Sequence, residues 1–229
     1  SLIASGPTVA DVSTLDDARR VIDTYGLQVS ATIREHLARP ANETPKPGDP
    51  CFDQTTATVV ASSRIFLDAA AAAMRSAGMA PFVLSDSVQG ESTDVAKSQA
   101  ALVRDIQHCG RPFPSPCVLL SGGETTVTVR GGGRGGPNME FLLSLLTELG
   151  DTTGVAALAC DTDGCDGSTT SAGALLLPDT ALRAARVGLD PSRFLADNDS
   201  LHFFAALGDL VDTGPTLTNV NDYRAILIE

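Results

Sequence analysis

The stretch CVLLSGGETTVTVRGGGRGGPNMEFLLSLLTELG, residues 117–150, contains the patterns that decide the fold. It opens with the apolar run CVLLS, which is typical of a buried strand. The segment TTVTVR at residues 125–130 alternates polar and apolar side chains, as a half-exposed antiparallel strand does. The GGE between the two runs therefore predicts a turn and a β-hairpin. A glycine-rich loop follows, and Pro137 lies in the first turn of an expected helix.

An α/β rhythm precedes this stretch. The run ATVVA at residues 57–61 predicts a strand, residues 62–78 a helix with a serine cap and a terminal glycine, and PFVL at residues 81–84 a second strand. Such β-α-β units build parallel sheets with right-handed crossovers. The fold class that we predict is α/β, with mostly parallel sheet layers, flanking helices and a C-terminal domain that includes the hairpin.

Two proline-rich breaks interrupt the pattern. TPKPGDP at residues 44–50 is typical of a linker or a long surface loop, and RPFPSP at residues 111–116 separates the β-α-β region from the hairpin. We predict two domains, residues 1–110 and residues 111–229.

Composition and charge exclude several classes of function. The chain of 229 residues has a formal charge of −12, from 16 basic and 28 acidic residues. This argues against nonspecific binding of nucleic acid and against docking on anionic membranes. No apolar run approaches the roughly 18 residues that a membrane span needs. The five cysteines show no C-x-x-C spacing, so reduced thiols in the cytoplasm are expected.

The glycine loop RGGGRGG is the first candidate site. Glycine lets backbone N–H groups approach an anion, a helix N-terminus adds positive partial charge, and Arg130 and Arg134 suit phosphate or carboxylate. Read literally, Gly131-x-Gly133-x-x-Gly136 also matches a dinucleotide fingerprint, with Asp161 or Asp163 in place to bind the ribose. The alternating strand before the loop argues against that second interpretation, because the first strand of such a fold is continuously apolar.

The acidic loop CDTDGCDG at residues 160–167 is the second candidate. Asp161 and Asp163 end a predicted strand, where they either hold Mg²⁺ beside substrate phosphates or form aspartate turns. Glu124 follows the first strand of the hairpin and is a candidate base, metal ligand or capping group. The turn ASGPT at residues 4–8 adds the hydroxyls of Ser5 and Thr8.

Four motifs occur together: LLSGGETTVTVRGGGRGGPNMEFLL, DTDGCDG, NDSLHFF and TGPTLTNVNDYRAILI. In this order they resemble the type-2 glycerate kinase family, whose C-terminal part is the MOFRL domain and whose members also carry the name hydroxypyruvate reductase. The resemblance covers nearly the whole chain. It implies ATP-dependent phosphorylation of D-glycerate at the 2-hydroxyl, Mg²⁺, a cytoplasmic setting and an active site between two α/β domains.

The resemblance also implies site residues. The catalytic candidates are Arg134, Arg130 and Glu124, and the candidate metal ligands are Asp161 and Asp163. Candidate ATP-binding residues are Gly131, Gly133, Gly135, Gly136, Asn138, Ser5 and Thr8.

The chain departs from the family pattern in two places. Pro137 stands where many members have Arg, so that Arg134 would have to supply the charge. The family's glycine–lysine segment has no match, so we expect this chain to be the later part of a longer protein, residues 1–110 being the later part of its larger domain.

Two alternatives remain open. The first is an NAD(P)H-dependent hydroxypyruvate reductase, in which the glycine loop binds the pyrophosphate of the cofactor. The second is a non-catalytic ligand-binding remnant. The expected partner is a small hydroxy acid in each enzyme reading, and a homodimer is compatible with the sequence, which does not fix the oligomeric state.

Overall fold

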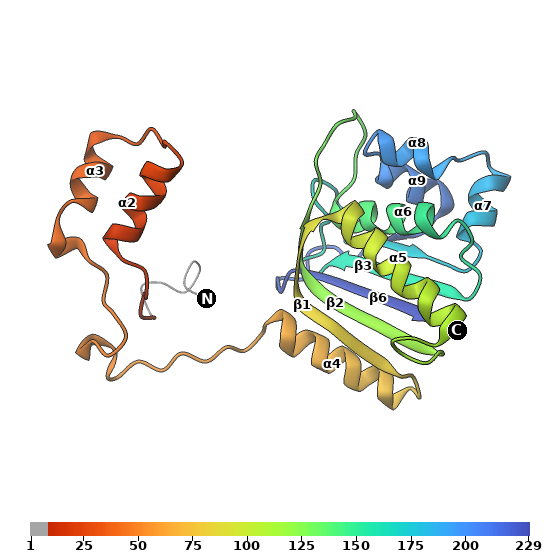
Figure 1. Cartoon of the computed structure of the whole chain (residues 1–229), viewed down its shortest axis with the longest axis horizontal. Coiled ribbons are helices and arrows are strands. Elements are labelled where there is room, and N and C mark those ends of the chain that lie inside the picture. Colours follow the sequence, from red (N-terminus) through yellow and green to blue (C-terminus); the bar gives the residue numbers. More distant parts are fainter. Residues whose placement is uncertain (1–8) are drawn as a thin grey trace. The chain divides into compact units, whose positions relative to one another are not determined.

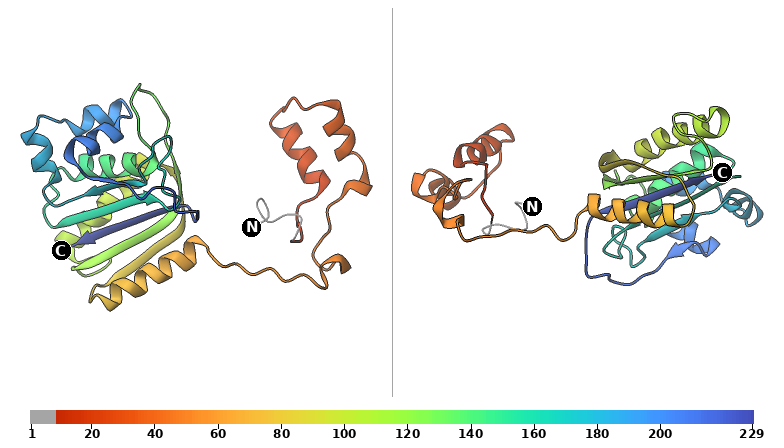
Figure 2. Two further views of the ribbon diagram at one scale, coloured as in Figure 1. Left: turned by 180° about the vertical axis from the view of Figure 1, so that it is seen from behind. Right: turned by 90° about the horizontal axis from the view of Figure 1, so that it is seen from below.

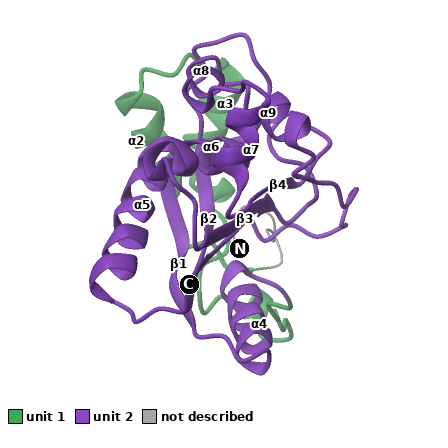
Figure 3. Ribbon diagram, turned by 90° about the vertical axis from the view of Figure 1, so that its right-hand side faces the viewer, with its two compact units in different colours: residues 1–60 green, residues 61–229 purple. Residues whose placement is uncertain are grey.

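The computed structural model describes residues 9–229, which form two compact units that divide after Val60 (Figures 1 and 3). The boundary predicted at residues 110 and 111 falls inside the second unit instead. Strands on either side of that boundary pair with each other, and this pairing joins the two segments into one sheet.

The first unit contains helices α2 (Leu15–Thr24) and α3 (Ala31–Leu37) and the 3-10 turns η1 (Pro40–Asn42) and η2 (Pro50–Phe52). Thr14 begins α2 with a capping box that includes Asp17, and the Ser30 hydroxyl caps α3. None of these four elements has a buried residue. Within its described residues 9–60, the unit is therefore organised by caps and surface polar contacts rather than by a buried core.

The second unit is built on one six-stranded sheet with the order β1-β2-β6-β3-β4-β5 (Figure 1). Its strands are β1 (Pro81–Glu91), β2 (Cys117–Thr126), β3 (Val155–Asp161), β4 (Gly173–Leu176), β5 (Leu210–Val211) and β6 (Asp222–Ile228). Its helices are α4 (Ser63–Ser76), α5 (Ser92–Cys109), α6 (Pro137–Leu149), α7 (Thr180–Arg186), α8 (Pro191–Ala196) and α9 (Ser200–Leu207).

The α/β class with flanking helices is confirmed, but the prediction of a mostly parallel sheet is wrong. Only β1 and β2 pair in parallel, and the other four pairings are antiparallel. Two segments cause the difference. Residues 57–61 form no strand, since Val59 and Val60 are 63% and 85% exposed and pair with no strand among residues 9–229. The last strand, β6, inserts antiparallel between β2 and β3.

The predicted β-hairpin is also wrong. Strand β2 continues through Ser121–Glu124 to Thr126, with β1 on one side and β6 on the other, and residues 127–130 form no strand. The two glycines at this point serve close packing rather than a turn. A Cβ on Gly122 would meet Leu67 of α4, and Gly123 has φ +130° with the backbone of Val88 against it.

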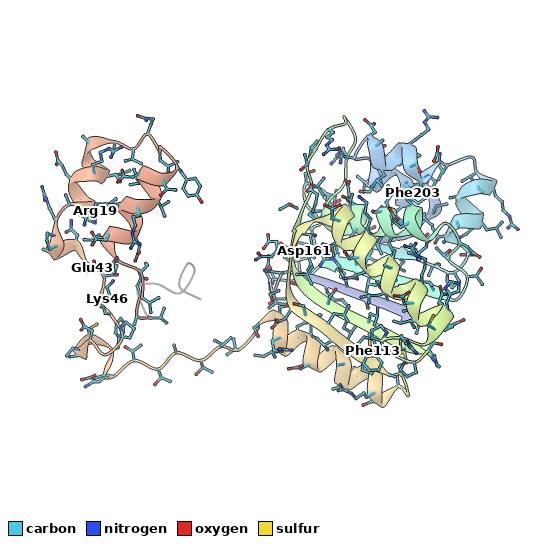
Figure 4. All side chains as sticks on the ribbon, viewed as in Figure 1. Arg19, Glu43, Lys46, Phe113, Asp161 and Phe203 are labelled. Atoms are coloured by element: carbon cyan, nitrogen blue, oxygen red, sulfur yellow. The ribbon has the colours of Figure 1, made fainter. Side chains whose placement is uncertain are left out.

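Helices cover both faces of the sheet unequally (Figure 2). Helix α4 packs on one face over a small cluster that includes Leu67, Leu120 and Tyr223. Helices α5 and α6 lie on the other face above the main core, to which α9 adds Phe203 (Figure 4). Within residues 9–229, no helix combines the length and the apolar composition needed to cross a bilayer.

Candidate active site

Several of the predicted residues lie at one edge of the sheet. Strands β2 and β3 run in the same direction on either side of β6, so their carboxyl ends lie together. Gly123, Asp222 and Asp161 are register partners across the three strands, and Figure 4 labels Asp161 at this edge. The exposed Glu124 follows the row by one residue, and the glycine loop leaves β2 at the same edge. Ligands of α/β sheets typically collect at such edges.

The glycine loop is tied by its backbone to the segment between α8 and α9. The N–H groups of Arg130 and Gly131 donate to Asn198 Oδ1 at 2.7 and 3.0 Å. The next three N–H groups along the loop donate to the aspartates on either side of Asn198. Only the N–H groups of Gly135 and Gly136 lack an acceptor within the described part of the chain. Any anion that binds through the loop backbone therefore depends on these two.

Close packing explains why the loop is rich in glycine. A Cβ on Gly133 would lie 2.6 Å from the carbonyl oxygen of Asp197, and one on Gly136 would lie 2.5 Å from that of Asp166. The other two glycines of the predicted site are equally close to residues in or just before α9. Gly132 alone in this loop has open space around it. The glycines of this loop therefore allow its close contact with residues 197–200 and with Asp166.

The N-terminus of α6 is occupied by a carboxylate of the protein itself. The two oxygens of Asp166 accept from the N–H groups of Asn138 and Met139 at 3.0 and 2.8 Å. The Asn138 side chain donates to Asp166 and also to Asp222 Oδ1, at 2.7 Å. Burial raises the pKa of Asp166 to about 6, against the opposing effect of these hydrogen bonds. Asn138 therefore links the helix start to the sheet edge.

A buried ion pair lies beneath this edge. Arg224 is fully buried, and its Nη2 donates to Asp222 and, at 2.7 Å, to the Thr125 hydroxyl. The Thr125 N–H donates in turn to Asp222, and the Ser92 hydroxyl donates to that of Thr125. Arg224 Nε and Nη1 have no hydrogen-bond partner among residues 9–229, and the guanidinium lies 5.2 Å from the centre of the Phe141 ring. This network holds the ends of β1, β2 and β6 together.

Asp161 and Asp163 form a turn with internal hydrogen bonds. Asp161 Oδ1 accepts from the N–H of Asp163, while Asp163 accepts from Cys165 N–H and from the Asn219 side chain. Burial, with the nearby charges of Asp163 and Asp222, raises the pKa of Asp161 to about 6. In the described chain no three histidine, cysteine, aspartate or glutamate side chains form a metal-binding group. The turn does fit Mg²⁺ held by one or two carboxylates alongside substrate phosphates.

Two pockets lie near this edge, on opposite faces of the sheet. One of about 400 Å³ is lined by Arg130, Glu140 and Lys97 on the side of α5 and α6. The other, of about 470 Å³, is largely apolar and is lined by Asp161 and by Phe66 of α4. The structure thus places Arg130 and Asp161 at one edge but in different pockets. Ser5 and Thr8 lie outside the described residues.

Sequence reasoning noted Asp166 as one of the clustered aspartates of the acidic loop, and it missed three residues of this edge as site residues: Asn198, Asp222 and Arg224. A usable signal existed for Arg224, because it is the single charge inside the apolar run YRAILI. Asn198 was recognisable only as part of a helix cap in DNDS, since its side-chain partners lie 58–68 residues earlier in the chain.

Residues 117–222 match the MOFRL family, and residues 1–38 match a domain of unknown function, DUF4147. A glycerate kinase of Macaca fascicularis is 31% identical over 276 residues, covering 99% of this chain and 68% of that protein. The chain belongs to the glycerate kinase family. Membership confirms the resemblance inferred from the four motifs.

Other relatives agree on the family but differ in name. A protein of Agrobacterium vitis named as a candidate hydroxypyruvate reductase is 47% identical over 230 residues, covering 100% of this chain and 52% of that protein. The crystal structure of a glycerate kinase from Thermotoga maritima has 32% identity and a TM-score of 0.85, covering 99% of this chain and 53% of that one. The chain therefore spans about half the length of the A. vitis and T. maritima proteins.

Proposed function

We propose that this chain forms part of an enzyme that transfers the γ-phosphoryl group of ATP to the 2-hydroxyl of D-glycerate, giving 2-phosphoglycerate and ADP. Membership of the glycerate kinase family supports the reaction class. One observation about the chain itself carries the proposal. The arginine-bearing loop, Glu124 and Asp161 lie at the same edge of the sheet.

The residue chemistry suits this reaction. Phosphoryl transfer depends on positioning and on positive charge at the migrating group. Arg130 and Arg134 are exposed, and beside them in the loop are the N–H groups of Gly135 and Gly136, which have no acceptor among residues 9–229. Glu124 is exposed near the end of β2, and in this proposal it accepts the proton of the glycerate hydroxyl.

Magnesium would be held by Asp161 and Asp163, where it would neutralise charge on the phosphates of ATP. Asp161 suits this role because its second oxygen has no hydrogen bond among residues 9–229. The Asn138 side chain is engaged with Asp166 and Asp222, so its contribution to ATP binding is to fix the start of α6.

Arg134 has the larger share of the anion binding in this proposal. The family's arginine position is Pro137 here, the first residue of α6, and it offers no charge. Arg134 lies three residues earlier in the exposed part of the loop. We therefore assign the transferred phosphoryl group to Arg134 and the carboxylate of glycerate or a further phosphate to Arg130.

A hydroxypyruvate reductase is the second candidate, because the A. vitis relative carries that name. Two observations favour the kinase. The sheet is mixed rather than parallel, and the start of α6, where a pyrophosphate would bind, already holds the carboxylate of Asp166.

The deciding experiment uses the protein expressed from its natural reading frame. It is incubated with Mg-ATP and D-glycerate, and separately with NADPH and hydroxypyruvate, and the products are identified by NMR. We expect 2-phosphoglycerate and no oxidation of NADPH. Oxidation of NADPH without ATP turnover would make the reductase correct, and no turnover with either pair would favour the non-catalytic alternative.

The variant Arg134→Ala sharpens the test. It should lower kcat/KM with ATP by about a hundredfold or more, the scale of a lost charge-assisted contact in a transition state. The matched control is Arg186→Ala, which removes an exposed arginine at the end of α7. Equal activity of the two variants would contradict the role given to Arg134.

A further inference from the structure

Asn198 connects the glycine loop to a buried carboxylate on α6. Its Oδ1 accepts from the N–H groups of Arg130 and Gly131 at 2.7 and 3.0 Å. Its Nδ2 donates to Glu140 Oε1 at 2.9 Å. The side chain is 9% exposed, so both ends of its amide are engaged in a largely water-free place.

Glu140 determines which way the Asn198 amide points. Burial raises the pKa of Glu140, but in its carboxylate form it only accepts hydrogen bonds, so it then selects the NH₂ end of the amide and turns the oxygen towards the loop. Glu140 is 5% exposed and has no cation as a hydrogen-bond partner among the described residues. A buried carboxylate without a cation costs free energy unless its hydrogen bonds are kept. The hydrogen bond from Asn198 therefore offsets part of the cost of burying Glu140.

The backbone conformation of Asn198 also suits asparagine better than most other residues. Its φ is +53°, in the left-handed region that asparagine tolerates better than most residues other than glycine. The conformation continues from the end of α8, where the Asn198 N–H donates to the carbonyl of Leu195. Strained positions of this kind persist where the surrounding contacts over-determine them.

The hydrogen bonds from the loop to Asn198 affect the position of Arg130. Asn198 fixes the N–H of Arg130 and of the residue after it, and these fix the direction in which the Arg130 side chain leaves the loop. Arg130, Glu140 and Asn198 line the same pocket of about 400 Å³. Arg130 and Glu140 therefore contribute opposite charges to the lining of one pocket.

We propose that Asn198, oriented by Glu140, is a positioning residue that sets the place of Arg130 for binding an anionic substrate. The identity of that anion, glycerate or a phosphate of ATP, rests on the proposed function. Neither Asn198 nor Glu140 touches the reacting atoms in this proposal. They act through the loop backbone.

The first test does not require catalysis. Amide hydrogen exchange of the intact chain is followed by NMR, with attention to Arg130 and Gly131. In Asn198→Ala the protection of both amides should fall by about tenfold, the scale of one buried hydrogen bond. The control Asn42→Ala removes an asparagine whose partner is His36 in the first unit, and it should leave the loop unchanged. Unchanged protection in Asn198→Ala would overturn the proposal.

Exchanging the amide of Asn198 and the carboxylate of Glu140 distinguishes a positioning role of their hydrogen bond from simple space filling. Asn198→Asp alone places a second carboxylate against Glu140 and should also loosen the loop. In the double variant Asn198→Asp with Glu140→Gln, the introduced amide NH₂ at position 140 donates to the introduced carboxylate at position 198. The other oxygen of that carboxylate still faces the N–H groups of the loop, so protection should return. Failure of the double variant to restore protection would contradict the orientation role of Glu140.

The second test measures KM and kcat for Mg-ATP and D-glycerate in the same variants. Asn198→Ala should raise one KM by about tenfold with a smaller change in kcat, and the double variant should restore it. Wild-type turnover with KM unchanged in Asn198→Ala overturns this inference alone. Absence of wild-type turnover overturns the proposed function, and the exchange measurement then decides whether Asn198 holds the loop.

Discussion

Replacing Gly133 by alanine tests the view that the glycine loop is built for packing. The added Cβ would lie 2.6 Å from both the carbonyl oxygen of Asp197 and the Cα of Asp199. Such overpacking typically costs about 1–3 kcal/mol, and these neighbours cannot rotate away, because they are backbone atoms. The hydrogen bond from Gly133 N–H to Asp197, at 2.9 Å, would be lost as well, at about 1 kcal/mol. We expect the free energy of unfolding to fall by about 3 kcal/mol.

The matched control is the adjacent residue. A Cβ on Gly132 would meet nothing within 4 Å, and its φ lies outside the left-handed region. Gly132→Ala should therefore leave stability unchanged or raise it by up to about 1 kcal/mol, through the reduced entropy of the unfolded chain. Urea unfolding followed by circular dichroism compares the two. Equal losses, or no loss in Gly133→Ala, would refute the packing argument and return the glycines to a role in ligand approach.

Three further outcomes follow from the buried groups. Asp166→Ala should lower the free energy of unfolding by about 3 kcal/mol in urea titrations, because two N–H groups at the start of α6 lose their acceptors. The pKa of Asp166 is raised to about 6 in the folded state, so the folded protein holds this proton more tightly than the unfolded chain does. The free energy of unfolding should therefore fall as the pH rises from about 4 towards 6. Asp166→Asn should remove this part of the fall in urea titrations across that range. Arg224→Met should lower the free energy of unfolding by about 3–5 kcal/mol, because Asp222 is left buried without its cation. Adding Asp222→Asn should recover most of that loss in thermal melts, and no recovery would contradict the charge argument.

The helices of the second unit were predictable because their signals are local. Helix α4 has its serine cap, its run of helix formers and a glycine within 17 residues, and α6 starts at the expected proline. The strand order of the sheet was not predictable, because it depends on pairings between distant segments. Thr125 and Asp222 are bonded across 97 residues, and no local pattern announces that contact. The run at residues 57–61 has the composition of a strand but pairs with no strand in the described part of the chain.

The candidate site shows the same division. The glycines and arginines of the loop and the aspartates of the acidic turn were visible as motifs, and their place at a common edge follows from the sheet. What the motifs could not reveal is that Asn198 and its neighbours, some 65 residues later, already satisfy most of the loop's N–H groups. The glycine-rich sequence predicted close approach of an anion, and the close contacts that the structure describes at these glycines are with the protein's own chain.

The central place of β6 determines when the second unit can assemble. Strands β2 and β3 each need β6 as a neighbour, and neither has it until the final residues of this chain have been made. At about 5–20 residues per second, the 97 residues between Thr125 and Asp222 take the ribosome about 5–20 s. During that interval β2, and after its own synthesis β3, present an open edge to the cell, which is the condition under which chains associate wrongly. We therefore expect the yield of folded protein in fast expression to depend on chaperones, even if the free energy of unfolding of the finished protein is high.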